Sequence, residues 1–139
     1  MEDVSLHMLD IAENALRAGA KNIFIRLSVG KREDRLVLEV TDDGEGMNDE
    51  TRRRSLDPFF TTKRGRRVGL GLPLLAQAAE EAGGTLDVQS APGKGTRVIA
   101  TFGLSHIDRR PLGDIEQTLQ CLKATHPEVC FRFESVETG

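Results

Sequence analysis

The chain begins with a stretch that carries a carboxylate and a carboxamide whose spacing could serve nucleotide chemistry. Asp10 and Asn14 lie four residues apart, so their side chains would share one face of a helix. An amide oxygen is a suitable hard ligand for Mg²⁺, and a carboxylate one turn earlier could accept a proton from an attacking water or hydroxyl. A polar helix face that is merely solvated would show the same pair, so the spacing alone leaves both interpretations open.

A second group of candidate residues is the glycine-punctuated acidic segment Asp42-Asp43-Gly44-Glu45-Gly46-Met47. Glycines at positions 44 and 46 would let the backbone turn sharply and approach a flat ligand. A carboxylate at the end of a strand can accept a hydrogen bond from an exocyclic amine such as that of adenine. A calcium loop is excluded, because the Asp-x-Asp-x-Asp spacing and the closing Glu are missing, but an ordinary acidic turn remains an alternative.

The third group is the glycine-rich segment 65–71, which leads into a predicted helix. Free backbone N–H groups there, together with the helix dipole, suit a phosphate. The segment lacks the ending of a P-loop and does not follow a strand as a Rossmann fingerprint does, so this signal is weak alone. Seven basic residues between positions 52 and 67, against the single acid Asp57, would attract phosphate, although a solvated charged face is the simpler explanation.

The hydrophobic pattern predicts the helices that must position these groups. Apolar residues at helical spacing predict an amphipathic helix over residues 3–18, which Gly19 would end. A short helix is expected over 49–55 and a second long one over 72–82, closed by Gly83.

Alternating apolar residues predict two antiparallel hairpins, formed by residues 23–29 with 36–40 and by residues 85–90 with 96–102. Beyond Gly103 we expect a linker over 106–111, a helix from a cap at Asp114 through Ala124, and a final strand over 129–134. The whole pattern predicts an α+β fold, a two-layer sandwich in which helices cover one face of a mixed sheet.

Composition narrows the classes of function. A chain of 139 residues is one domain by ordinary size rules. A net charge of −3, no Trp or Tyr and only 6 Phe argue against a nucleic-acid partner. No apolar stretch reaches the length of a membrane span, and the acidic N-terminus is unlike a secretory signal. The two cysteines, Cys121 and Cys130, are too few for a disulfide scaffold, so we expect a cytoplasmic protein.

In order and spacing these groups resemble the motifs of the GHKL superfamily, the ATP-binding domain shared by gyrase, Hsp90, sensor histidine kinases and MutL. The resemblance spans about residues 4–102 and rests on five ordered segments: 13–20 (N box), 42–47 (G1 box), 57–63 (F box), 69–72 (G2 box) and the Gly-x-Gly-Thr turn at 93–96. It implies a Bergerat-type ATP-binding domain over residues 1–103. Residues 104–139 would be a helix–strand extension packed on the same domain.

The resemblance also implies a role for each matching residue. Asn14 would ligate a Mg²⁺ ion that bridges the ATP phosphates, and Asp10 would stand where ATP-hydrolysing members carry a catalytic Glu. Asp42 would accept a hydrogen bond from the adenine amino group. The remaining nucleotide-binding residues would shape the base pocket, form the lid over 61–71 or contact the base beside the aspartate: Gly44, Gly46, Met47, Phe60, Thr61, Lys63, Gly69, Leu70, Gly71 and Thr96.

Three functions fit this inventory. The first is a kinase-like ATPase that phosphorylates a partner protein in trans, as anti-sigma kinases do, and the second is a conformational module with slow ATP hydrolysis. The third is a non-catalytic nucleotide sensor whose lid switches a protein–protein interaction. No His stands in a phosphoacceptor context and the chain begins at the N-box helix, so we do not expect an autophosphorylating sensor kinase. Residues 104–139 could add a strand, build a homodimer surface or simply complete the core, and the partner stays unidentified.

Overall fold

The structure is a computed structural model that describes residues 4–57, 71–106 and 111–138. The strands are β1 (Asn22–Gly30), β2 (Arg35–Asp42), β3 (Leu86–Ser90), β4 (Thr96–Gly103) and β5 (Cys130–Thr138). The helices are α1 (Val4–Arg17), α2 (Asp49–Ser55), α4 (Gly71–Glu81) and α5 (Pro111–Thr125), with a 3₁₀ turn at Leu104–His106. Within these ranges no helix combines the length and the apolar character that crossing a membrane requires.

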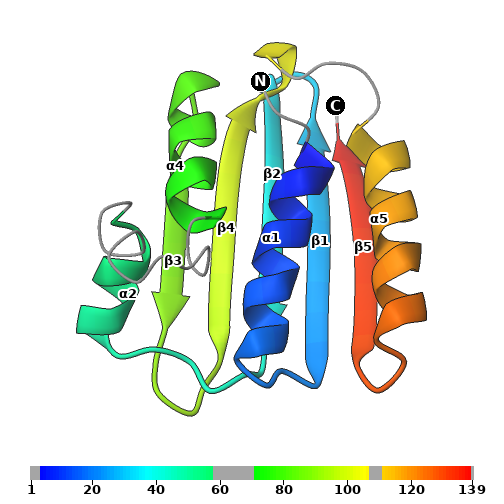
Figure 1. The fold of residues 1–139 in the computed structure, drawn as a ribbon. Helices are drawn as coiled ribbons and strands as arrows, with labels where there is room; N and C mark the ends of the chain where they lie inside the picture. The colour runs from blue at the N-terminus through cyan, green and yellow to red at the C-terminus, as the bar shows by residue number, and fades with distance from the viewer. Residues whose placement is uncertain (1–3, 58–70, 107–110, 139) are drawn as a thin grey trace.

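The five strands form one mixed sheet in the order β3-β4-β2-β1-β5. The pairs β1–β2, β2–β4 and β3–β4 are antiparallel, whereas β1 and β5 run parallel. Both predicted hairpins are therefore confirmed, and the pairing of β2 with β4 joins them edge to edge. Figure 1 shows α1, α4 and α5 in front of the same side of this sheet. The predicted α+β architecture, with a mixed sheet and helices on one face, is confirmed.

Side chains alternate along each strand, so one sheet face is buried and the other meets solvent. In β1, Ile23, Ile25 and Leu27 are buried, whereas Arg26 between them is exposed. The exposed face carries ion pairs between neighbouring strands, such as Arg26–Glu134 at 3.7 Å. The hydrophobic core therefore lies in one layer, between the sheet and its three covering helices.

Helix α1 lies against the sheet through the apolar stripe that its sequence predicts. The residues of this stripe are at most 3% exposed: Val4, Met8, Ile11 and Ala15. Gly19 ends the helix with a φ of 78°, and the Ala20 N–H donates back to the Ala15 carbonyl at 3.1 Å. This is a Schellman motif, in which a left-handed glycine lets the chain leave the helix with its last carbonyls hydrogen-bonded. Helix α1 is thus fixed in place both at its buried face and at its C-terminal end.

The C-terminal elements differ from the sequence prediction in their bounds. Helix α5 begins at Pro111, so Asp114 lies inside the helix and is not its cap. Proline is well suited to a first helical position, where its missing N–H would have no partner and its φ is already helical. Strand β5 continues to Thr138, because it pairs with β1 along its whole length as far as Gly30. Periodicity within the last segment alone could not show this pairing.

Because β5 completes the sheet and α5 packs beside α1, we expect the C-terminal segment to unfold together with the rest. Ile115 on α5 is fully buried, so Ile115→Ala should lower the free energy of unfolding by about 2–5 kcal/mol in one cooperative transition. Chemical denaturation followed by circular dichroism measures this, with the exposed Glu116→Ala as the matched control. Two separate transitions in Ile115→Ala would show instead that residues 104–139 fold as an independent unit.

Candidate functional site

A cavity of about 370 Å³ opens between α1, α2, the start of α4, the loop after β2, and β4. Much of its wall is apolar, contributed by Ile11, Ala15, Ala18, Met47, Leu72 and Val98. The ionisable and amide groups on the wall are Asn14, Arg17, Asp42 and Glu45, and the hydroxyl groups are those of Thr51, Ser55 and Thr96. The cavity therefore combines surfaces for a flat apolar group with a few polar groups that can fix its orientation.

Asp42 is the last residue of β2 and stands opposite Thr96, the first residue of β4. Its Oδ1 accepts the Gly44 N–H at 2.8 Å. Burial raises the pKa of Asp42 above its ordinary value, while hydrogen bonds from the Gly44 and Thr96 backbone partly offset that effect. The half-buried carboxylate can only accept hydrogen bonds when ionised, so a ligand that offers N–H donors would relieve the cost of its burial.

Two glycines let the loop after β2 fit between its neighbours. A Cβ on Gly44 would lie 2.9 Å from both the Cβ and the carbonyl oxygen of Ala18. Gly46 has a φ of +72°, and a Cβ there would lie 2.0 Å from the Ala91 carbonyl oxygen. Side chains at these positions would push the loop away from the α1–β1 connection on one side and the β3–β4 turn on the other.

Hydrogen bonds hold the same loop from both sides. The Glu45 N–H donates to the Ala18 carbonyl at 2.9 Å, and the Glu45 carbonyl accepts the Gly93 N–H at 2.7 Å. The Met47 N–H donates to Ser90 Oγ at 2.8 Å. We call residues 42–47 the braced loop, because both neighbouring connections fix its backbone.

Asp43 adds a third anchor, which the sequence did not indicate. Its Oδ1 accepts the backbone N–H groups of Lys21 and Asn22 at 2.8 and 2.9 Å, and its Oδ2 accepts the Asn22 side-chain amide at 2.8 Å. These hydrogen bonds, with the Asn22 side chain as the largest contribution, lower the pKa of Asp43 to about 2. The carboxylate therefore stays ionised at neutral pH and ties the braced loop to the start of β1.

On α1, Asn14 and Arg17 line the cavity together. The Arg17 Nη1 donates to Asn14 Oδ1 at 3.2 Å, so the amide oxygen already holds a cationic group. Asp10 lies one turn earlier and is half-buried, but it is not among the lining residues of the cavity. Within the described part of the chain, no three His, Cys, Asp or Glu side chains gather closely enough to hold a metal ion.

A magnesium nucleotide nevertheless fits this donor set. Mg²⁺ keeps several waters and usually takes one or two protein ligands together with phosphate oxygens, so a protein cage is not required. Asn14 offers a hard oxygen on the cavity wall. This oxygen already accepts a hydrogen bond from the positively charged Arg17 side chain, so it can interact with a cationic group.

The predicted lid residues are placed only in part. The lid residues Thr61, Lys63, Gly69 and Leu70, and the F-box residue Phe60, lie outside the described residues, whereas Gly71 begins α4 and the next residue, Leu72, is a buried part of the cavity wall.

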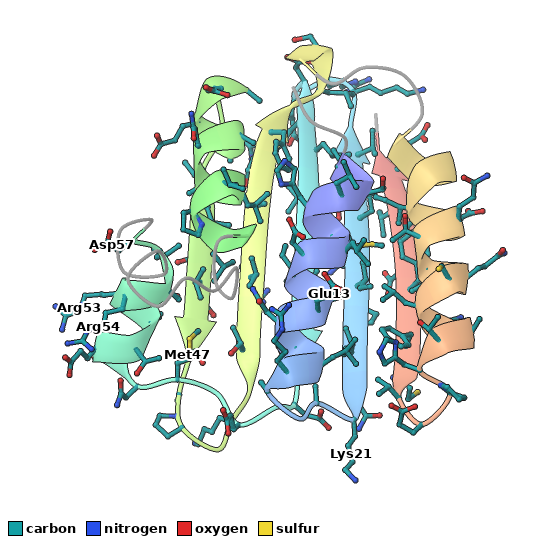
Figure 2. The ribbon with its side chains drawn as sticks, in the orientation of Figure 1. Glu13, Lys21, Met47, Arg53, Arg54 and Asp57 are labelled. Atoms are coloured by element: carbon teal, nitrogen blue, oxygen red, sulfur yellow. The ribbon has the colours of Figure 1, made fainter. Side chains whose placement is uncertain are left out.

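The basic residues of α2 lie mainly on its solvent side. Figure 2 shows Arg53 and Arg54 directed away from the sheet. Arg54 pairs with Glu50 at 2.6 Å, and Arg52 lies 3.9 Å from Asp49. For these three of the seven basic residues, the simpler explanation of a solvated charged face therefore fits better than a phosphate-attracting field.

Sequence reasoning missed several residues that line or support the cavity. Arg17 belongs to the polar stripe of α1 that contains Asp10 and Asn14, so its spacing was a usable signal. Thr51 and Ser55 share one face of α2 and also line the cavity. Ser90 had no sequence signal, because it supports the braced loop from 43 residues away.

A mixed sheet with helices on one face, and a half-buried acceptor on a largely apolar cavity wall, define a two-layer α+β domain with a ligand-sized cavity. The family described as "Histidine kinase-, DNA gyrase B-, and HSP90-like ATPase" matches residues 3–106. The chain therefore belongs to this family of ATP-binding domains, and the predicted GHKL resemblance is confirmed.

The similar curated proteins are longer kinases. Sensor histidine kinase YxdK of Bacillus subtilis is 37% identical over 97 residues, which are 66% of this chain and 30% of that protein. Sensor protein kinase FleS of Pseudomonas aeruginosa is 37% identical over 111 residues, 79% of this chain and 27% of that protein. The chain thus spans less than a third of the length of these relatives.

A solved structure extends the likeness of fold beyond the family match. The MutL ATPase domain of Aquifex aeolicus, complexed with ADP, superposes on this chain with a TM-score of 0.65. The superposition includes 97% of this chain and 60% of the MutL chain. At 16% identity this likeness concerns the fold alone. Because it covers nearly the whole chain, it reaches past residue 106 into the C-terminal elements.

The close approach at Gly46 predicts a stability difference between two glycines of similar backbone conformation. Gly93 also has a positive φ, of +76°, but a Cβ there would meet nothing within 4 Å. Gly93→Ala should therefore lower the free energy of unfolding by about 1–2 kcal/mol, because an alanine is strained in the left-handed conformation. Gly46→Ala should lower it by a further ~1–3 kcal/mol, because its Cβ would also clash with Ala91. Urea unfolding measures both variants, and equal losses would contradict the tight seating of the braced loop.

Proposed function

We propose that this domain binds ATP with Mg²⁺ in the described cavity and acts on a partner protein, by phosphoryl transfer in trans or by slow hydrolysis. The observation that carries the proposal is the half-buried Asp42 carboxylate on a cavity wall that is otherwise largely apolar and also contains Asn14 and Arg17. A hydrogen-bond acceptor for a base and polar groups for phosphates thus border one space.

Base recognition would follow from the braced loop. The Asp42 carboxylate would accept an N–H of the adenine amino group, while Gly44 and Gly46 keep the backbone close to the base. Apolar side chains such as Met47 and Val98 would cover the ring faces. The amino group would thereby add a further donor to a half-buried carboxylate that already accepts the Gly44 N–H.

Phosphate chemistry would depend on α1 and the lid. Asn14 would hold the metal, which when bound supplies a positive charge that stabilises charge developing on the phosphate oxygens. Arg17 would remain close enough to the metal site to pair with phosphate. Asp10, one turn before Asn14, would accept the proton of the attacking water or hydroxyl. The lid residues Thr61, Lys63, Gly69, Leu70 and Gly71 would close over the phosphates, and the F-box residue Phe60 would also contact the nucleotide.

The comparisons support this proposal and favour a kinase-type role. The relatives YxdK and FleS are named as sensor kinases, and the MutL ATPase domain has been solved with ADP. A nucleotide sensor without catalysis is the second candidate, favoured by the position of Asp10 outside the cavity lining. We also propose a cytoplasmic location and a regulatory protein as partner.

Nucleotide binding tests the proposal directly. We expect Mg²⁺-dependent ATP binding by the native protein in calorimetry, and affinity lower by about 10–100-fold in Asp42→Asn, because a neutral amide, with an N–H₂ donor of its own, replaces the charged acceptor. The control Asp87→Asn, an exposed carboxylate on β3, should bind within about twofold of native. An absence of ATP binding by the native protein would overturn the proposal.

Thermal unfolding separates a lost site from a lost fold in Asp42→Asn. A carboxyl whose folded pKa is raised disfavours the folded state once it ionises, so the native protein loses stability as pH rises through that pKa. Asp42→Asn lacks this penalty and should be no less stable than native at pH 7.

Two variants on α1 then distinguish catalysis from sensing. Asn14→Ala should weaken ATP binding in the presence of Mg²⁺ but much less in its absence. Asp10→Asn should bind ATP normally and lose turnover. Unchanged turnover in Asp10→Asn would remove this residue from the mechanism, and an absence of turnover in the native protein would favour the sensor.

A further inference from the structure

Ser90, the last residue of β3, has three hydrogen-bond partners around one hydroxyl group. Its Oγ lies 2.8 Å from the Met47 backbone nitrogen, 2.9 Å from the Gly95 carbonyl oxygen and 2.9 Å from Thr96 Oγ1. The side chain is half-buried and does not line the cavity. It therefore stands behind the cavity wall and connects the braced loop with the start of β4.

Counting hydrogens fixes the direction of these bonds. A hydroxyl has one hydrogen and two lone pairs. The Met47 N–H can only donate and the Gly95 carbonyl can only accept, so the Ser90 hydrogen belongs to Gly95. The second lone pair of Ser90 is then left for Thr96, which must be the donor in the Ser90–Thr96 pair.

This direction decides what Thr96 offers to the cavity that it lines. The only hydroxyl hydrogen of Thr96 is directed to Ser90, so its oxygen can act only as an acceptor toward a ligand. The neighbouring Asp42 carboxylate is also an acceptor, and it already uses the Gly44 N–H. The side chains of Asp42 and Thr96 therefore present only hydrogen-bond acceptors to a ligand in the cavity, and neither side chain presents a donor.

From this geometry we infer that Ser90 is a specificity-determining residue that acts by holding the Thr96 hydroxyl as an acceptor. A base with an amino group at its 6-position satisfies the wall, whereas a base with a carbonyl there places oxygen against two acceptors. The cavity thus selects aminopurine over oxopurine nucleotides. This inference rests on the proposed function and adds to it the origin of base discrimination.

The test compares ATP with ITP, which carries a carbonyl where ATP carries the amino group. We expect native protein to bind ATP at least about tenfold more tightly than ITP, because an unsatisfied buried acceptor is costly. In Ser90→Ala the Thr96 hydroxyl is free to turn its hydrogen toward the cavity. The ITP-to-ATP ratio of dissociation constants should then fall at least about threefold.

Matched variants separate this role from simple support of the loop. Loss of the Met47 contact alone would weaken both nucleotides equally and leave the ratio unchanged. Ser90→Thr keeps the hydroxyl and should keep the native ratio. In a Thr96→Val background, Ser90→Ala should no longer change the ratio, because the hydroxyl that it controls is gone. Ser90→Cys fills nearly the same space with a weak hydrogen-bonding group and provides a second variant if Ser90→Ala does not fold.

The outcomes distinguish this inference from the proposed function. Native binding of ATP with a ratio that neither Ser90→Ala nor Ser90→Cys changes would overturn the role of Ser90 alone. Native protein that binds neither nucleotide would overturn both the inference and the proposed function. A lowered ITP-to-ATP ratio in Ser90→Ala or Ser90→Cys, together with the native ratio in Ser90→Thr, supports the inference.

Discussion

The braced loop, residues 42–47, is the constraint on which the rest of the site depends. Its backbone hydrogen-bonds to Ala18 on one side and to Gly93 on the other, so the end of α1 and the β3–β4 turn are joined through it. Asp43 fastens the same loop to the start of β1. Because α1 carries Asn14 and the loop carries Asp42, these bonds set the relative position of the proposed metal-binding and base-binding residues.

The sheet supplies the second half of this arrangement. Pairing of β2 with β4 places Asp42 opposite Thr96, at the point where both strands reach the cavity. Burial there raises the pKa of Asp42, so ionisation of this carboxyl group lowers the free energy of unfolding. A chain selected for stability alone would not keep this group, so its cost is consistent with a role in binding.

Local patterns predicted the elements well because their causes are local. The apolar spacing of α1 and the stop at Gly19 each depend on a few neighbouring residues, and both appear in the fold. The parallel pairing of β5 with β1 depends instead on segments more than 100 residues apart, and it lengthened the last strand beyond its predicted end. The sequence places the start of α5 at Asp114, three residues too late, because aspartate is favourable both as a cap and in the first turn of a helix, where Asp114 lies.

The site also contains residues that local sequence motifs indicate and residues whose roles depend on contacts between distant segments. Asn14, Asp42, Gly46, Met47 and Thr96 were named from motifs, and the structure places all of them on one cavity wall, although their roles stay proposals. The supports of the site could not be found in this way. Asp43 contacts residues 21–22, whereas Ser90 contacts Met47 and residues 95–96. Such contacts exist only once the strands have paired.

The hydrogen bonds of the braced loop should form before any nucleotide binds. Native-state amide hydrogen exchange of the nucleotide-free protein tests this most directly, since it reports the opening of individual hydrogen bonds. We predict that the Glu45, Met47 and Gly93 amides, which donate to Ala18, Ser90 and Glu45, are protected to a degree similar to the amides of β2. Exchange of these three amides at the rate of an unstructured peptide, beside a protected sheet, would contradict it.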